Sequence, residues 1–114
     1  MSKKQFLKRI MTDGVMTSTN TLTSTEFEVG STASLGVQFI WTGSSVSGTL
    51  SCQASNDNGT TWSTVTVTLP TISSSNGGNG IAAFVDFPYQ KIRFRYVNSS
   101  STGVMNMYLC GKEN

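Results

Sequence analysis

The sequence contains no histidine, only two cysteines and two prolines, and charged residues make up just 12% of its 114 positions. Without histidine, Ser-His-Asp and Cys-His catalysis and histidine-ligated metal sites are excluded. Two cysteines cannot complete a zinc or iron–sulfur site. No run of about 18 apolar residues is present to form a membrane-spanning helix. The composition therefore predicts a binding or structural protein with no metal and no cofactor, and argues against an enzyme.

The few charges are unevenly distributed along the chain. Lys3, Lys4, Lys8 and Arg9 lie near the N-terminus, and the next basic residue is Lys91. A net charge of +2 is too small to predict nucleic-acid binding. Between these basic segments Ser, Thr, Asn and Gly dominate. A surface of this kind has few charges to desolvate, which suits close packing against copies of itself or neighbouring subunits.

From residue 17 onward, apolar and polar residues alternate in short runs separated by clusters of Gly, Asn and Ser. Alternation with one apolar face is typical of strands that bury one side. The runs are 17–29, 35–42, 48–55, 62–69, 81–87, 90–97 and 104–111. Their number and spacing predict an all-β fold, an antiparallel β-sandwich of about seven to eight strands, jelly-roll or immunoglobulin-like, over residues 17–114.

The same alternation predicts which side chains form the core. The inward-facing residues are expected to be Val37, Phe39, Trp41, Leu50, Cys52, Ala54, Val65, Val67, Leu69, Ile81, Ala83, Val85, Phe87, Ile92, Phe94, Tyr96, Met105, Met107 and Leu109.

Residues 1–16 are predicted to form a short, basic, amphipathic N-terminal arm. A helix here would place its apolar residues on one side and most of its basic residues on the other. The expected contact residues are Lys3, Lys4, Phe6, Leu7, Lys8, Arg9, Ile10 and Met11. Three roles remain open: insertion into a neighbouring subunit, packing against the protein's own sandwich, and membrane-surface binding, for which one short helix anchors weakly.

One sharp motif lies at residues 55–62, where SNDNGTTW fits the pattern S-x-D-x-G-x-T-W. The five defining residues are Ser55, Asp57, Gly59, Thr61 and Trp62. The motif resembles the Asp-box, a β-hairpin known from sialidases and other β-propellers. An aspartate can accept backbone N–H groups in such a turn, and glycine can adopt a positive φ. A single copy predicts a structural hairpin rather than a glycosidase.

Three further groups of residues are candidate sites. Lys91, Arg93 and Arg95 share one face of a strand and could grip an acidic neighbour, lipopolysaccharide or nucleic acid, or form an ordinary solvated face. Glu26 and Glu28 could ligate calcium or serve glycoside hydrolysis, but no other acid is near in sequence, which favours solvated edge charges instead. Among the aromatic residues, Trp41, Phe87 and Tyr96 are in register with core positions, which leaves Tyr89 as the best exposed candidate for a glycan contact.

Residues 36–112 as a whole resemble small virion proteins encoded by bacterial viruses. The resemblance is carried by VQFIWTG, GTLSCQASNDNGTTW, GNGIAAFVDFPYQKIRFRYVNSSSTG and a final LCGK. It implies a β-sandwich of the decoration, spike, fibre or tail-associated kind, located in the virion, without a catalytic signature. Because virus particles assemble in a reducing cytoplasm, Cys52 and Cys110 are expected to be thiols rather than a disulfide.

Two functions follow from these observations. The first is a non-enzymatic structural component of a bacteriophage virion, a symmetric homo-oligomer that docks to other virion proteins through its arm and sandwich faces. The alternative is a carbohydrate- or receptor-binding sandwich used in host attachment, with a host-surface glycan as partner. Neither nucleic acid nor membrane is expected as a partner. A small hydrolase is nearly excluded by the absence of histidine and the scarcity of acids.

Overall fold

A computed structural model of the protein describes residues 5–16, 21–29, 32–43, 46–74, 77–85, 89–100 and 102–113. Ten β-strands are found in these ranges. The described ranges contain no helix, and hence none long enough to cross a membrane. Lys3, Lys4 and Phe87 lie outside the described residues, and the side chains of Phe6 and Val85 are not described.

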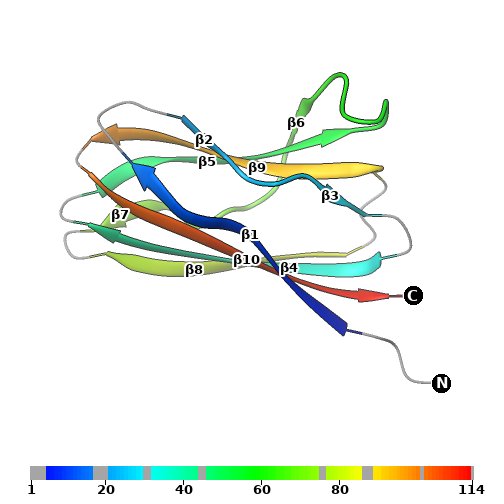
Figure 1. Ribbon diagram of the computed structural model, residues 1–114, viewed down its shortest axis with the longest axis horizontal. Helices are drawn as coiled ribbons and strands as arrows, with labels where there is room; N and C mark the ends of the chain where they lie inside the picture. The colour runs from blue at the N-terminus through cyan, green and yellow to red at the C-terminus, as the bar shows by residue number, and fades with distance from the viewer. Residues whose placement is uncertain are drawn as a thin grey trace.

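The strands form two antiparallel sheets that pack face to face, as Figure 1 shows. Sheet A has the spatial order β1 (Gln5–Met16), β10 (Gly103–Glu113), β4 (Thr32–Gly43) and β8 (Gly78–Val85). Sheet B is built on the neighbouring strands β9 (Lys91–Ser100) and β5 (Val46–Ser55). Its shorter strands are β2 (Thr21–Thr23) and β3 (Phe27–Glu28) beside β9, and β6 (Ser63–Val65) and β7 (Ile72–Ser74) beside β5.

The connectivity of the strands identifies the sandwich as a jelly roll. The chain crosses between sheet A and sheet B at six of its nine connections, and stays within sheet B only between β2 and β3 and between β5, β6 and β7. An immunoglobulin sandwich instead repeatedly places consecutive strands in one sheet. The predicted all-β antiparallel sandwich is confirmed, and the jelly-roll topology is the one of the two alternatives that this strand order fits.

The core lies between the two sheets and is centred on aromatic rings. Phe94 of β9 contacts Phe39 of β4 edge to face, with ring centroids 5.6 Å apart, and stacks on Phe84 of β8 at 6.2 Å. The predicted core positions that are buried are Val37, Phe39, Trp41, Cys52, Ala54, Ile92, Phe94, Tyr96, Met105, Met107 and Leu109. Cys52 is a buried thiol, and no disulfide joins it to Cys110.

The predicted orientation of β8 is wrong. Ile81 is 71% exposed and Ala83 is exposed, whereas Ala82 and Phe84 are buried. The pairing with β4 explains the difference, because Ala82 lies opposite the fully buried Val37 and must therefore face the same side of the sheet. Since β8 carries apolar residues in both alternating phases, its sequence does not distinguish the core side from the solvent side.

The N-terminal segment is a strand, so the expectation of a helix is also wrong. β1 pairs with β10 from Gln5 opposite Lys112 to Met16 opposite Gly103. The pairing register shifts between Arg9 and Met11 and again between Met11 and Gly14. These bulges interrupt the two-residue alternation. The apolar residues of this strand consequently recur with a spacing that resembles a helical face.

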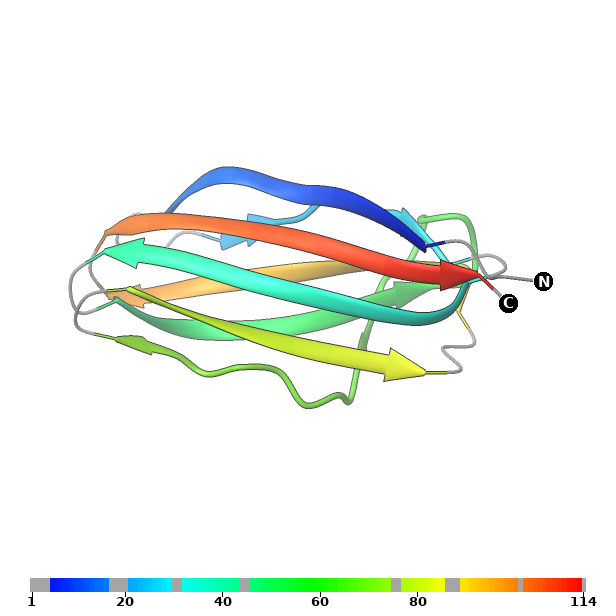
Figure 2. The same cartoon turned by 90° about the horizontal axis from the view of Figure 1, so that it is seen from below.

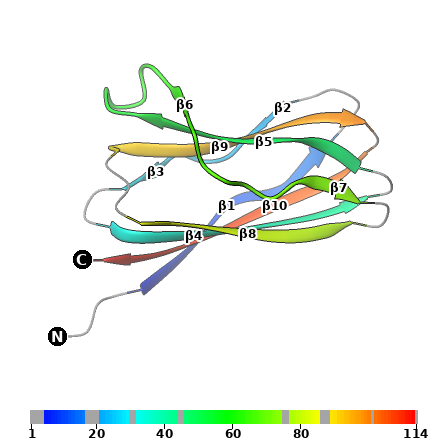
Figure 3. The ribbon, with the colours of Figure 1, turned by 180° about the vertical axis from the view of Figure 1, so that it is seen from behind.

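The predicted strand at 62–69 is shorter than expected, because only Ser63–Val65 forms β6. Figure 3 shows the following chain descending along the side of the sandwich to β7. Val67 and Leu69 are half-buried and pack on the core from this segment. A Cβ atom on Gly80 would lie 2.5 Å from the Pro70 ring, so β8 and this segment approach closely.

Gly48 gives a test of core packing in sheet B. The hydroxyl of the buried Tyr96 donates to Asn98 Oδ1 at 2.9 Å, and a Cβ on Gly48 would lie 2.2 Å from that hydroxyl oxygen. We expect Gly48→Ala to lower the free energy of unfolding by about 1–3 kcal/mol, because the ring and its hydrogen bond must shift. The matched control is Gly36→Ala, where a Cβ meets nothing within 4 Å. Equal urea midpoints for the two variants would contradict this packing.

Candidate functional site

The motif at residues 55–62 forms the turn between β5 and β6, and its side chains hydrogen-bond to the turn backbone. The Ser55 hydroxyl donates to Asp57 Oδ1 at 2.7 Å and accepts the Gly59 N–H at 2.9 Å. Asp57 Oδ1 also accepts the Thr61 N–H at 2.9 Å. Asn58 and Gly59 have positive φ values of 61° and 86°, which turn the chain back toward β6. The side chains of Ser55 and Asp57 thus stabilise the turn through hydrogen bonds to each other and to its backbone.

Trp62 packs against the same turn. Its indole N–H donates to the Gly59 carbonyl at 3.1 Å. The Arg93 guanidinium lies 4.3 Å from the centroid of the indole ring, which is a cation–π contact. The five predicted hairpin residues therefore lie in one turn, and β9 contributes a cation that packs on it.

The carboxyl group of Asp57 is held in its ionised form. The hydrogen bonds from the Ser55 hydroxyl and the Thr61 N–H lower its pKa from 3.8 to about 2. An aspartate with so low a pKa is deprotonated at neutral pH and cannot donate a proton as a general acid. The role of Asp57 in this geometry is that of a structural acceptor.

Tyr89 lies next to this hairpin, although the two are more than 25 residues apart in the sequence. The Gln90 N–H donates to Asn56 Oδ1 at 2.8 Å, and the Asn58 N–H donates to Gln90 Oε1 at 2.7 Å. These two hydrogen bonds tie the segment before β9 to the turn after β5. They bring together two candidates that sequence reasoning had treated separately.

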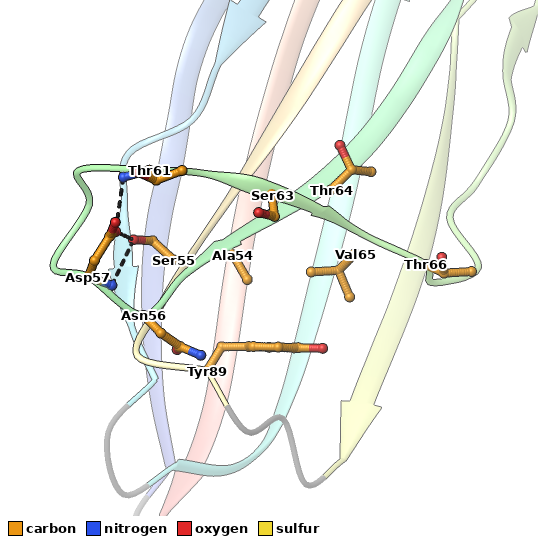
Figure 4. A pocket seen from close by; sticks show the side chains of 10 residues that line it. All are labelled: Ala54, Ser55, Asn56, Asp57, Thr61, Ser63, Thr64, Val65, Thr66 and Tyr89. Carbon is orange, nitrogen blue, oxygen red and sulfur yellow. Dashed lines mark hydrogen bonds between the residues drawn. The ribbon is translucent and has the colours of Figure 1, made fainter.

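A pocket of about 690 Å³ opens between the hairpin and Tyr89 (Figure 4). Ala54 and Val65 point toward the half-buried Tyr89 ring from the strands above it. The remaining lining side chains are polar: Ser55, Asn56, Asp57, Thr61, Ser63, Thr64 and Thr66. The pocket therefore combines a small apolar floor with many hydroxyl and amide groups, and it contains the residue predicted to contact a glycan.

The predicted basic face lies on the outer side of β9, where two of its three residues have partners within the chain. Lys91 Nζ is 3.4 Å from Glu26 Oε1. Arg93 Nε donates to Gln53 Oε1 at 2.8 Å, in addition to its contact with Trp62. Arg95 is half-exposed on the same face. These contacts join Lys91 to the residue before β3 and Arg93 to the hairpin.

Glu26 and Glu28 are exposed beside β9, and Glu28 pairs with Lys91 in the strand register. In the part of the chain that the structure describes, no group of three or more His, Cys, Asp or Glu residues could hold a metal ion. Glu26 instead forms an ion pair with Lys91.

The residues of the predicted arm are divided between the core and the surface. Ile10 and Met11 are 2% and 8% exposed and belong to the core. Leu7 is 80% exposed and Arg9 is exposed on the outer side of sheet A. Lys8 is exposed, with its Nζ 5.9 Å from the centroid of the Phe27 ring. The segment thus packs against its own sandwich, and part of it faces outward.

Sequence reasoning missed the outer face of sheet A. Four of the five large apolar side chains recorded as exposed in the described chain lie on it, namely Leu7, Val15, Ile81 and Tyr108. The signal was present in β8, whose apolar residues occupy both alternating phases. This signal was missed because each strand was assumed to bury its apolar face and to expose a polar one.

The chain matches no protein-family model and no curated protein. Its fold is similar to that of the SPBc2 prophage-derived protein YomS, with a TM-score of 0.63 and 17% identity over 99% of this chain and 96% of that one. It is also similar to chains from infectious bursal disease virus, in the Gx strain (TM-score 0.62, 14% identity) and in the VP2 subviral particle (TM-score 0.61, 13% identity). The alignments cover 97% and 98% of this chain and 32% and 33% of those.

The lowered pKa of Asp57 predicts how the hairpin responds to acid. The ionised carboxylate stabilises the turn fully above its ordinary pKa of 3.8, and this stabilisation is lost as the pH falls through about 2. In NMR spectra the Thr61 amide shift is expected to titrate with a midpoint near 2. In Asp57→Asn this titration should disappear. A midpoint near 3.8 in the unmodified protein would show that the carboxylate does not hold the turn.

Proposed function

We propose that the protein is a non-enzymatic structural component of a bacteriophage virion. In this proposal it assembles as a symmetric multimer and docks to neighbouring virion proteins through β1 and the sandwich faces. The observation that carries the proposal is the likeness of the whole jelly roll, over nearly the full length of both chains, to a prophage-derived protein. The same fold occurs within chains of infectious bursal disease virus, including one in a subviral particle.

The surface of the molecule supports an assembly role. Charged residues are scarce, so little charge must be desolvated when subunits meet. Large apolar side chains are exposed on sheet A, and exposed apolar patches mark interaction sites in soluble proteins. Acidic residues that could take part in catalysis are engaged in structural contacts. Asp57 hydrogen-bonds within the hairpin, and Glu26 pairs with Lys91.

The proposal predicts that the protein is found in purified particles of the virus that encodes it. Mass spectrometry of such particles should detect the chain in many copies, at a fixed ratio to the other virion proteins. Treatment with salt should not remove it, because a stable subunit contact buries well over about 1,200 Å². Absence from particles, together with abundance in the infected cell, would contradict a virion role.

A second function, glycan binding for host attachment, is favoured by the pocket at Tyr89. Its polar rim offers hydroxyl and amide groups to sugar hydroxyls, and the tyrosine ring and Val65 offer an apolar surface to the sugar ring. The hydrogen bonds between Gln90 and the hairpin fix the two walls relative to each other. This site would be compatible with a place on the virion surface.

Glycan binding can be tested with an array of neutral and acidic oligosaccharides, followed by calorimetry on any that bind. Tyr89→Ala is expected to weaken binding by about tenfold or more, equivalent to about 1.4 kcal/mol. Tyr89→Phe keeps the ring and should retain most of the affinity. Equal affinities for the alanine variant and the unmodified protein would remove Tyr89 from the site.

A further inference from the structure

The outer side of sheet A is uncovered and carries exposed apolar side chains among polar ones; we call it the sheet A face. Figure 2 shows β1, β10, β4 and β8 side by side, with no described segment crossing in front of them. Leu7 and Ile81 are 80% and 71% exposed on this surface, and Val15 and Tyr108 are 56% and 37% exposed. Apolar area of this kind is unfavourable in water unless a partner covers it.

The strand register arranges the sheet A face in rows of large and small side chains. One row runs across the strands through Arg9, Tyr108, Gln38 and Ile81. The next row runs through Leu7, Cys110, Gly36 and Ala83. Its last three residues have small side chains, so we call it the low row. A Cβ atom built on Gly36 meets nothing within 4 Å, so the space above this row is open.

Two of the charges on this surface, those of Arg9 and Asp13, compensate each other. Arg9 Nη2 lies 3.9 Å from Asp13 Oδ1 and also donates to the Asn106 amide oxygen. The guanidinium lies 5.0 Å from the centroid of the Tyr108 ring. Lys112 is exposed near the end of β10, away from the centre of the rows. Two copies of such a surface can approach without strong repulsion between like charges.

We propose that the sheet A face is the surface through which two copies of this chain associate, face to face about a two-fold axis. The inference rests on the proposed function for its premise that the chain self-assembles, and it names the surface and the partner. In an isologous contact the same patch serves both subunits, so the patch must be self-complementary. The rows meet this requirement, because the large residues of one copy can lie over the low row of the other.

The area of the sheet A face is sufficient for a specific dimer. Its strands have 12, 11, 12 and 8 residues. At about 3.3 Å per residue and about 4.8 Å between strands, four strands of about ten residues cover about 630 Å² per copy. Two copies then bury about 1,300 Å², which falls within the range of about 1,200–2,000 Å² that specific interfaces occupy.

The test is the oligomeric state of charged variants, measured by analytical ultracentrifugation across a range of concentrations. Ile81→Arg places a like charge opposite or beside its symmetry mate and is expected to raise the dimer dissociation constant by at least about 100-fold. The matched control is Val97→Arg. Val97 is 41% exposed but lies on β9, on the outer side of sheet B, where it pairs with Thr21 and Thr49. This variant should associate like the unmodified protein.

Cys110 provides a second readout that does not depend on hydrodynamics. It lies within the low row of the sheet A face and is half-exposed in the single chain. Cys52 is buried, and burial raises the pKa of its thiol to about 12, so a maleimide reports on Cys110. Labelling should slow as the protein concentration rises, and this protection should be absent in Ile81→Arg. Circular dichroism and the urea midpoint establish that each variant is folded.

The outcomes separate this inference from the proposed function. If Ile81→Arg associates normally and Val97→Arg does not, sheet B carries the contact and the inference is overturned, although a virion role can stand. If the unmodified protein is monomeric at high concentration and Cys110 is never protected, a second copy does not cover this face. If Ile81→Arg is monomeric but the chain is absent from particles, the interface stands and the virion role fails.

Discussion

The packing of Phe94 between Phe39 and Phe84 is the contact on which the two-layer structure depends. Phe94 belongs to sheet B and its two partners belong to adjacent strands of sheet A, so one ring joins three strands across the sandwich. Each ring can reach the centre only if the residues beside it point outward, because side chains alternate across a strand. The orientation of these three residues therefore fixes which side chains of β9, β4 and β8 face solvent, including Arg93 and Ile81.

The consequence for the surface differs between the two sheets. In β9 the residues forced outward are basic from Lys91 to Arg95, with Val97 as the apolar exception. Arg93 packs on Trp62 of the hairpin, and Lys91 pairs with Glu26. In β8 the residues forced outward include the apolar Ile81 and Ala83, which are exposed in the described chain, together with Asn79. The outer side of sheet B is therefore mostly polar, whereas the outer side of sheet A carries several large exposed apolar residues that a partner chain can cover.

The sequence predicts the fold class and much of the core because alternation is clean where only one face is apolar. In β9, Ile92, Phe94 and Tyr96 alternate with basic residues, and all three are buried. Prediction fails where local rules are overridden by pairing. Ile81 could be assigned to the wrong side because only the register with Val37 decides the phase of β8. The bulges in β1 could not be foreseen either, because they arise in the pairing with β10, where Asn106 Oδ1 accepts the Asp13 N–H at 2.8 Å.

The candidate site, too, could be predicted from the sequence only in part. The hydrogen bonds of the turn follow from the local motif, and their residue types were predicted from sequence. The meeting of that turn with Tyr89 depends on the side chains of Asn56 and Gln90 and on the backbone N–H of Asn58. None of these is a defining position of the motif, and the pairing of β5 with β9 places them together. A pocket formed by two segments distant in sequence can be found only once the sheet register is known.

The edges of sheet A explain why association through its face is more suitable than association through its strands. An exposed edge can add further strands without limit, and natural proteins blunt their edges for this reason. β1 is interrupted by two register shifts and by Asp13 with φ of 47°, which bend the edge away from regular pairing. β8 is the shortest strand of the sheet and begins with Gly78, Asn79 and Gly80, which weaken a strand. With both edges unsuited to strand addition, the apolar area of sheet A is best covered by a closed, two-fold contact, which ends with two copies instead of growing into a fibre.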